Sequence, residues 1–167
     1  MLAQGAAHCK LAGGRATGAP CSRVSVAQDK PKYRFVISHL RDAKFDSVAR
    51  LGQLQVRDLG LVAATDGAIR AVVARAGGPC VPNDTGGRHH HDYDIQLMYC
   101  LKGWQLINLG DGIGTIRIEA GTFWAQPHGL VHEILDHSDD FEILVVNLPA
   151  AFGTYPESAQ ATQAHPA

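Results

Sequence analysis

Two histidine-containing segments constrain this chain more than any other feature. They read His89-x-His91-x4-Gln96-x6-Gly103 and, further along, Gly121-x5-Pro127-x-Gly129-x2-His132. Because residues two apart on a strand point to the same face, His89 and His91 can present both imidazoles to one side. His132 then has to come from an adjacent strand. The two segments together predict a small β-barrel with one bound divalent metal ion.

The remaining pattern is that of an all-β protein. Short apolar runs are separated by Gly, Pro, Asn and Asp between residues 31 and 156, which is typical of a sandwich or barrel of short strands. Within Asp94–Leu101, alternation places Gln96, Met98 and Cys100 on one face. The expected strands are Tyr33–Ile37, Leu59–Ala64, Ile69–Ala76, Asp94–Leu101, Trp104–Asn108, Thr115–Glu119, Phe123–Gln126, Val131–Asp136 and Phe141–Leu148. The second and third of these should form a hairpin joined at residues 65–67.

Composition limits the classes of partner. The chain has 167 residues, of which 46% are hydrophobic and 19% charged, with a formal net charge of −1. These values fit one globular domain with a core and do not point to nucleic acid or a membrane as partner. Four cysteines without CxxC spacing do not make a disulfide framework, so we expect a reduced, cytoplasmic protein.

Domain boundaries follow from the distribution of apolar residues. Residues 1–31 are rich in Gly, Ala and small polar residues, and we expect a disordered or poorly ordered N-terminal tail there. This segment partly resembles a transit peptide but lacks an obvious amphipathic helix. Residues 32–157 form the predicted barrel domain, and residues 158–167 form a frayed C-terminal tail.

The candidate ligands are His89, His91, Gln96 and His132. Neutral imidazole is a common ligand of iron, nickel, copper and zinc, and three imidazoles with an open coordination position form a familiar catalytic site. Alternation directs His90 away from the site. Metal-bound imidazoles usually need a second partner, for which Asp92 or Asp94 is a candidate.

Four further residues are candidates for the pocket or for the surroundings of the metal. Met98 and Cys100 share the face of Gln96, although core packing is the simpler interpretation of both. His128 lies in the Pro127–Gly129 turn, where it is either an exposed turn residue or an acid/base group. Tyr93 lies on the bend between the ligands.

The two segments resemble the two conserved motifs of the cupin superfamily. The first motif reads G-x5-H-x-H-x3–4-E-x6-G and the second reads G-x5-P-x-G-x2-H-x3-N. The matching positions in this chain are His89, His91, Gly103, Gly121, Pro127, Gly129 and His132. The resemblance covers roughly residues 59–149. It implies a jelly-roll type barrel with a six-stranded core, a metal ion inside one end, and often a homodimer.

The chain departs from the cupin pattern at three positions. Asn83 takes the place of the first glycine, Asp136 that of the final Asn, and Gln96 that of the usual Glu. The last change matters most, because Gln offers a neutral carbonyl oxygen and cannot act as a general base. It disfavours manganese and magnesium and favours iron, zinc, nickel or copper. Gln96 either ligates the metal or only hydrogen-bonds a metal-bound water.

Three functions are compatible with these residues. The leading hypothesis is a metal-dependent dioxygenase, with iron, that acts on a small enolisable, aromatic or thiol substrate. The second is a metal-dependent isomerase or lyase with His128 or Tyr93 as the base. The third is a non-catalytic module that binds or senses a small ligand. The fold alone does not decide among them.

Overall fold

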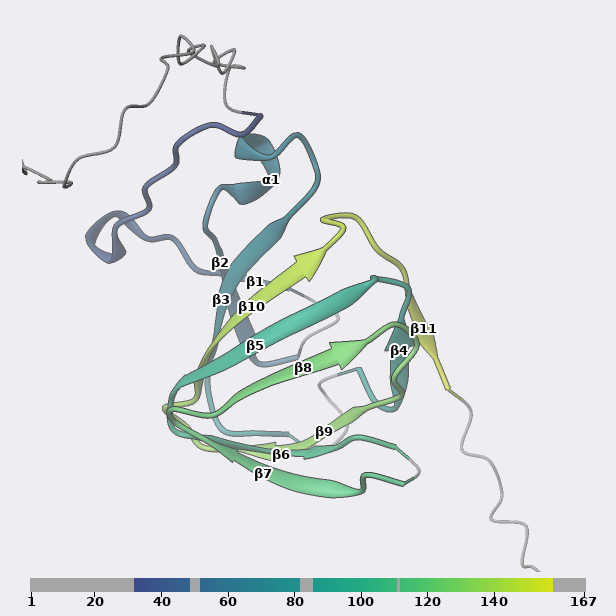
Figure 1. The fold of residues 1–167 in the computed structure, drawn as a ribbon. Coiled ribbons are helices and arrows are strands. Elements are labelled where there is room, and N and C mark those ends of the chain that lie inside the picture. The colour runs from purple at the N-terminus through teal and green to yellow at the C-terminus, as the bar shows by residue number, and fades with distance from the viewer. Residues whose placement is uncertain (1–31, 49–51, 82–85, 111, 158–167) are drawn as a thin grey trace, which may run out of the picture. The chain divides into compact units, whose positions relative to one another are not determined.

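The computed structural model describes residues 32–48, 52–81, 86–110 and 112–157. Both predicted tails, residues 1–31 and 158–167, and the motif position Asn83 lie outside the described residues. Almost all regular structure in the described part is β-strand, as predicted (Figure 1). No helix in this part of the chain is long and apolar enough to cross a membrane.

The strands form three antiparallel sheets. Their order is β1-β2-β3-β10-β5-β8 in the largest sheet, β7-β6-β9 in the second and β11-β4 in the third. Figure 1 shows the six-stranded sheet over the three-stranded sheet. The bounds are β1 Asp46–Ser47, β2 Leu54–Asp58, β3 Arg70–Ala76, β4 His89–His91, β5 Ile95–Lys102, β6 Trp104–Asn108, β7 Thr115–Glu119, β8 Phe123–Pro127, β9 Glu133–His137, β10 Glu142–Leu148 and β11 Thr154–Pro156.

The core lies between the two larger sheets. Both contribute buried apolar side chains to one cluster, whose members include Val56, Val72, Met98, Cys100, Ile107, Ile118, Phe141 and Ile143. Along β5, the even-numbered Gln96, Met98 and Cys100 are buried, which confirms the predicted alternation. The fold is the predicted jelly-roll type. In the described residues the strands form separate sheets and not one continuously hydrogen-bonded barrel.

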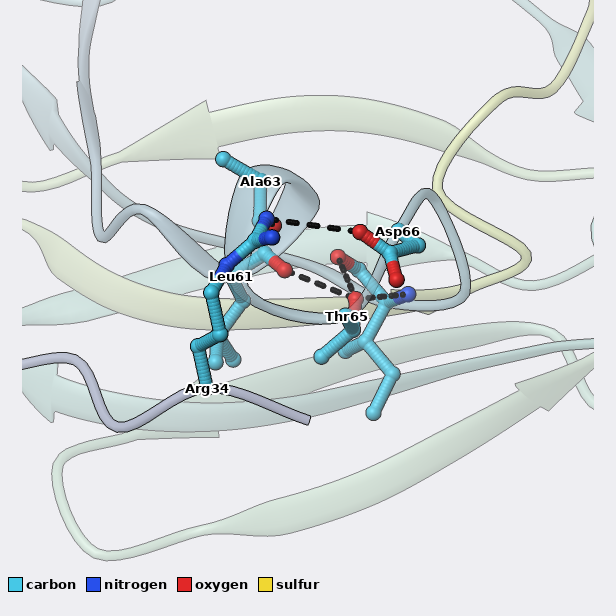
Figure 2. Close-up of polar contacts among 6 residues, drawn as sticks. Arg34, Leu61, Ala63, Thr65 and Asp66 are labelled. Carbon is cyan, nitrogen blue, oxygen red and sulfur yellow. Dashed lines mark hydrogen bonds and ion pairs between the residues drawn. The ribbon is translucent and has the colours of Figure 1, made fainter. Parts of the chain in front are cut away.

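The prediction of a strand at Leu59–Ala64 was wrong. Residues Leu61–Ala64 form the short helix α1, preceded by Gly60 in a left-handed conformation with φ of 82°. The Thr65 hydroxyl donates to the Leu61 carbonyl oxygen at 2.7 Å and accepts from the Ile69 N–H at 2.9 Å (Figure 2). These local bonds satisfy the backbone within the turn, so the apolar run does not need a strand partner.

The predicted strand Tyr33–Ile37 was also wrong, because this segment makes no strand pairs. The Arg34 N–H donates to the Ala64 carbonyl oxygen at 2.8 Å. The Arg34 guanidinium donates to the Ala63 carbonyl oxygen and lies 3.3 Å from the Asp66 carboxylate (Figure 2). The segment therefore crosses the end of α1. A single-turn 3₁₀ helix at Leu40–Asp42 follows it.

The motif glycine Gly103 makes the tight turn between β5 and β6. Its φ is 66°, and a Cβ atom there would lie 2.7 Å from Asp140 Oδ1 and 3.0 Å from Phe141 Cα. Any side chain would meet both a left-handed backbone and a close neighbour. The turn takes the chain from β5 in the six-stranded sheet, which carries Gln96, to β6 in the three-stranded sheet.

Candidate metal centre

Three histidines meet at one end of the fold. His89 and His91 lie on β4, and His132 precedes β9. The His89 N–H donates to the His132 carbonyl oxygen at 3.0 Å, and the His132 N–H donates to the His89 carbonyl oxygen at 2.8 Å. This backbone bridge brings the two motifs together. One potential ligand atom from each imidazole lies within 4.8 Å of the others, so the cluster could hold a metal ion.

Hydrogen bonds at the Nδ1 atoms define how the three rings can bind a metal. The partners are carbonyl oxygens: Gly87 for His89 at 2.7 Å, Gly153 for His91 at 3.3 Å, and Leu130 for His132 at 3.0 Å. A carbonyl oxygen only accepts, so Nδ1 carries the hydrogen in His89 and His132, and each Nε2 keeps a lone pair for a metal. His91 Nδ1 has a second and nearer neighbour, the Thr154 hydroxyl at 2.9 Å. Backbone carbonyls fill the orienting role that we expected of Asp92 or Asp94.

Burial keeps His132 in the neutral form that a metal needs. His89, His91 and His132 are 8%, 9% and 6% exposed. Burial lowers the pKa of His132 from 6.5 to about 4, with a smaller opposing effect of its bond to the Leu130 carbonyl. A neutral His132 binds a divalent cation without first having to lose a proton.

The C-terminal strand β11 supports the cluster from outside the two motifs. It pairs with β4, with Thr154 opposite His91. Thr154 Oγ1 lies 2.9 Å from His91 Nδ1. The Asp92 carboxylate accepts from the Gly153 N–H and, at 2.9 Å, from the Tyr155 hydroxyl. The same two bonds lower the pKa of Asp92, so it anchors β11 as an anion.

Beside the histidines lies a cavity of about 300 Å³. Its wall is mostly apolar and includes Val56, Val72, Ile107, Phe141, Ile143 and Phe152. Its polar lining residues are the three histidines, Arg70, Gln96, Gln105, Gln126, Asn147 and Thr154. Among the described residues, no Asp or Glu lines this cavity. A cation held there would meet no protein carboxylate, as the Gln96 position indicated.

Gln96 lies on the cavity wall in a buried amide network. Its Nε2 donates to Asn147 Oδ1 at 2.8 Å, and its Oε1 accepts from the Tyr93 hydroxyl at 3.4 Å. The Tyr93 ring lies 5.2 Å from the His91 ring, centroid to centroid. The network therefore connects the Gln96 carbonyl oxygen to the surroundings of the cluster. The Oε1 atom keeps one lone pair beyond its bond to Tyr93.

The other sequence candidates lie at different depths. Met98 lines the cavity. Cys100 is fully buried in the core, where its thiol lies 3.5 Å from the Lys102 carbonyl oxygen. Tyr93 is fully buried too, and this burial raises the pKa of its hydroxyl. His128 is exposed, and its Nδ1 lies 3.2 Å from the Tyr93 carbonyl oxygen.

Several residues of the cavity had not been identified from the sequence. They are Arg70, Gln105, Gln126, Asn147, Phe152 and Thr154. Asn147 carried a usable signal, since it is a polar residue inside the apolar run of β10. Gln126 carried no such signal, because its burial in β8 between the exposed Ala125 and Pro127 is visible only in the structure.

Comparisons with known proteins identify the fold. No family model matches the chain, and no curated protein matches its sequence. The polyketide cyclase RemF from Streptomyces resistomycificus superposes with a TM-score of 0.61 at 18% identity, over 77% of this chain and 88% of that chain. KdgF from Halomonas sp. gives a TM-score of 0.53 at 19% identity, over 69% of this chain and 94% of that chain. An RmlC-like cupin from Shewanella frigidimarina gives a TM-score of 0.51 at 15% identity, over 71% of this chain and 95% of that chain.

The comparisons show the fold alone. The chain has the cupin-type fold of these structures, and a buried three-histidine cluster lines its cavity. Such a cluster, next to a mostly apolar cavity, can hold a metal ion and present it to a small molecule.

Proposed function

We propose that this protein is a metal-dependent enzyme, specifically a dioxygenase, that acts on a small oxygen-bearing substrate which binds as an anion. One observation carries the proposal: three buried, pre-oriented imidazoles line a cavity whose described wall contains no carboxylate. The metal-binding residues would be His89, His91 and His132, with Gln96 as a fourth or nearby ligand. When bound, the metal would act as a Lewis acid toward a substrate oxygen.

The residues of the chain supply binding, orientation and exclusion of water. The carbonyls of Gly87, Gly153 and Leu130 fix the imidazole rings. Apolar side chains, among them Phe141 and Phe152, surround the substrate. The described lining includes no Asp, Glu, Lys or Tyr that could take a proton from the substrate. We therefore expect a substrate that ionises readily, such as a 1,3-diketone or a catechol.

Iron is the proposed metal, with zinc, nickel or copper as the alternatives. The ligand set is neutral, with three nitrogen donors and an amide oxygen available nearby. Such a set suits these metals better than manganese or magnesium, which favour carboxylate oxygens. Metal binding should also stabilise the fold, because the ligands come from distant parts of the sequence.

A second candidate function is an oxygen-independent reaction, as an isomerase, lyase or cyclase. It is favoured by the structural likeness to a polyketide cyclase, the best of the three superpositions. It needs a proton acceptor at the substrate. His128 and Tyr93 are the sequence candidates, yet neither lines the cavity in the described structure. The non-catalytic ligand-binding function is the outcome if neither type of turnover is found.

Oxygen consumption separates these functions. The protein is reconstituted anaerobically with iron and then given oxygen with a panel of 1,3-diketones, catechols and thiols. We expect substrate-dependent oxygen uptake that His91→Ala abolishes. Turnover of a panel member without oxygen uptake would favour the cyclase or isomerase. Failure of every member to consume oxygen would refute the dioxygenase.

We also propose that the protein acts in the cytoplasm as a homodimer. Among the described residues, Cys100 is a free cysteine buried in the core. On the outer face of the largest sheet, Tyr99, Leu101 and Phe123 are 42%, 45% and 61% exposed. Tyr99 and Phe123 are cross-strand partners, so they form one apolar patch. Light scattering of wild type beside Phe123→Lys would test the dimer.

A further inference from the structure

Four strands place polar residues in one line across the cavity wall. Gln126 on β8 is the cross-strand partner of Gln96 on β5. Gln96 is the partner of Asn147 on β10, and Asn147 is the partner of Arg70 on β3. Side chains directly opposite each other on paired strands share a face of the sheet. All four residues line the cavity, so the line lies on its inner face.

Two members of this line are buried without partners for their amide groups. Gln126 is 1% exposed, and within the described structure neither its Nε2 nor its Oε1 has a hydrogen-bond partner. Asn147 is also 1% exposed, and its Nδ2 has no partner there either. Buried amides are almost always hydrogen-bonded, so each such exception needs a cause. Their position on the cavity wall suggests that the missing partner enters the cavity.

The hydrogen-bond network determines what that partner must offer. Asn147 Oδ1 accepts from Gln96 Nε2 at 2.8 Å, which leaves the Asn147 Nδ2 hydrogens for an acceptor in the cavity. Gln126 offers both a donor and an acceptor. A carbonyl oxygen of the ligand can accept from Asn147 Nδ2, and a hydroxyl of the ligand can both donate to and accept from the Gln126 amide. The two backbones are two strand spacings apart, about 10 Å, which leaves room for a ring between the two oxygens.

We propose that Gln126 and Asn147 form a polar subsite for a compact ring compound with a hydroxyl at one end and a carbonyl at the other. The hydroxyl faces Gln126, the carbonyl faces Asn147, and the apolar wall contacts the ring. This assignment rests on the proposed function, because it names the substrate class of the same cavity. Arg70 is the cationic residue of the described lining, and as the cross-strand partner of Asn147 it lies at the carbonyl end of the line.

Binding of a matched pair of probes tests the subsite. 4′-Hydroxyacetophenone carries both oxygens, and 4-isopropenyltoluene replaces them with carbon at the same shape. Calorimetry uses the full chain as purified, with its metal content measured, and again after treatment with a chelator. We expect wild type to bind the oxygenated probe at least tenfold more tightly in both samples. The chelated sample isolates the amide wall from any metal contact.

Gln126→Leu is the test variant and Met98→Leu the control, since Met98 lines the same cavity without a polar group. Gln126→Leu should lose at least tenfold in affinity for the oxygenated probe, keep its metal content, and melt no lower than wild type. Met98→Leu should keep the preference. Gln126→Met replaces Gln126→Leu if the latter does not fold.

An equal affinity of wild type for both probes, or a preference that survives in Gln126→Leu, would overturn the subsite. Neither result bears on metal-dependent turnover.

Discussion

Thr154 Oγ1 lies 2.9 Å from His91 Nδ1, and this contact joins strand β11 to one of the three clustered histidines. The two residues are also cross-strand partners. The Gly153 carbonyl oxygen lies 3.3 Å from the same nitrogen. The orientation of the His91 ring therefore depends on residues far along the chain from both histidine motifs.

Thr154→Val should weaken metal binding without unfolding the protein. Valine keeps the shape and removes the oxygen beside His91 Nδ1, so this nitrogen loses its shorter contact and keeps the longer one to the Gly153 carbonyl oxygen. Loss of such an outer partner typically costs about 10- to 100-fold in metal affinity. Competition with a coloured chelator measures the change. Thr154→Ser keeps the oxygen and should bind metal as wild type does; equal affinity of the Val and Ser variants would contradict the role of Thr154.

Gln96→Glu should shift metal preference toward manganese. A carboxylate at this position adds a negative charge beside the three neutral imidazoles, and manganese gains more from oxygen ligands than zinc or copper does. Asn147 can turn its amide to donate to the new carboxylate, because its Nδ2 has no partner in the described structure. Metal competition followed by elemental analysis gives the preference. An unchanged preference would mean that Gln96 lies too far from the metal to ligate it.

The metal-free protein should lose stability as the pH falls from about 6.5 to 4. The folded-state pKa of His132 is about 4, below its ordinary value of 6.5. The unfolded chain therefore takes up the proton first, and acid favours unfolding. The effect reaches about 3 kcal/mol at most when the pH falls below both pKa values. Urea unfolding at several pH values measures it.

Two histidine variants isolate this effect from other titrating groups. His132→Gln should flatten the pH dependence between pH 6.5 and 4. His128→Gln, at an exposed position, should leave it unchanged. The attribution to His132 would be wrong if both variants kept the wild-type slope.

Gly103→Ala should destabilise the fold more than Gly121→Ala. Both glycines have positive φ, 66° and 91°, so both substitutions strain the backbone. Only at Gly103 does an added Cβ atom also meet a close neighbour, Phe141 Cα at 3.0 Å, whereas nothing lies within 4 Å of it at Gly121. We expect a loss of about 3 kcal/mol for Gly103 and about 1 kcal/mol for Gly121. Equal losses in urea unfolding would show that the steric contact is unimportant.

The sequence predicted the parts of this protein that depend on local periodicity. Alternation on β5 and β4 placed Gln96, His89 and His91 on their faces, and motif spacing associated His132 with them. Leu61–Ala64 was mistaken for strand because a short apolar run is ambiguous between helix and strand. Its helical turn depends on Gly60, on the Thr65 hydroxyl and on a distant Arg34.

The cavity wall could not be predicted in the same way. Gln126, Gln96 and Asn147 come from three strands, and only the register of those strands places them in one line. Register between distant strands is set by the packing of the whole sheet and leaves no local pattern in one sequence. The contact of Thr154 with His91 could not be predicted for the same reason, since it depends on the pairing of β11 with β4.

Elemental analysis of tag-free protein tests the central claim most directly. Wild type is compared with His91→Ala and with the control His90→Ala. In wild type, His90 Nδ1 lies 2.7 Å from Glu157 Oε1, and the His90 ring stacks on Tyr155. We expect near-stoichiometric iron, zinc, nickel or copper in wild type and in His90→Ala, and none in His91→Ala. Wild type that stays metal-free after reconstitution with each of these metals, or His91→Ala that binds as much metal as wild type, would contradict the three-histidine metal centre.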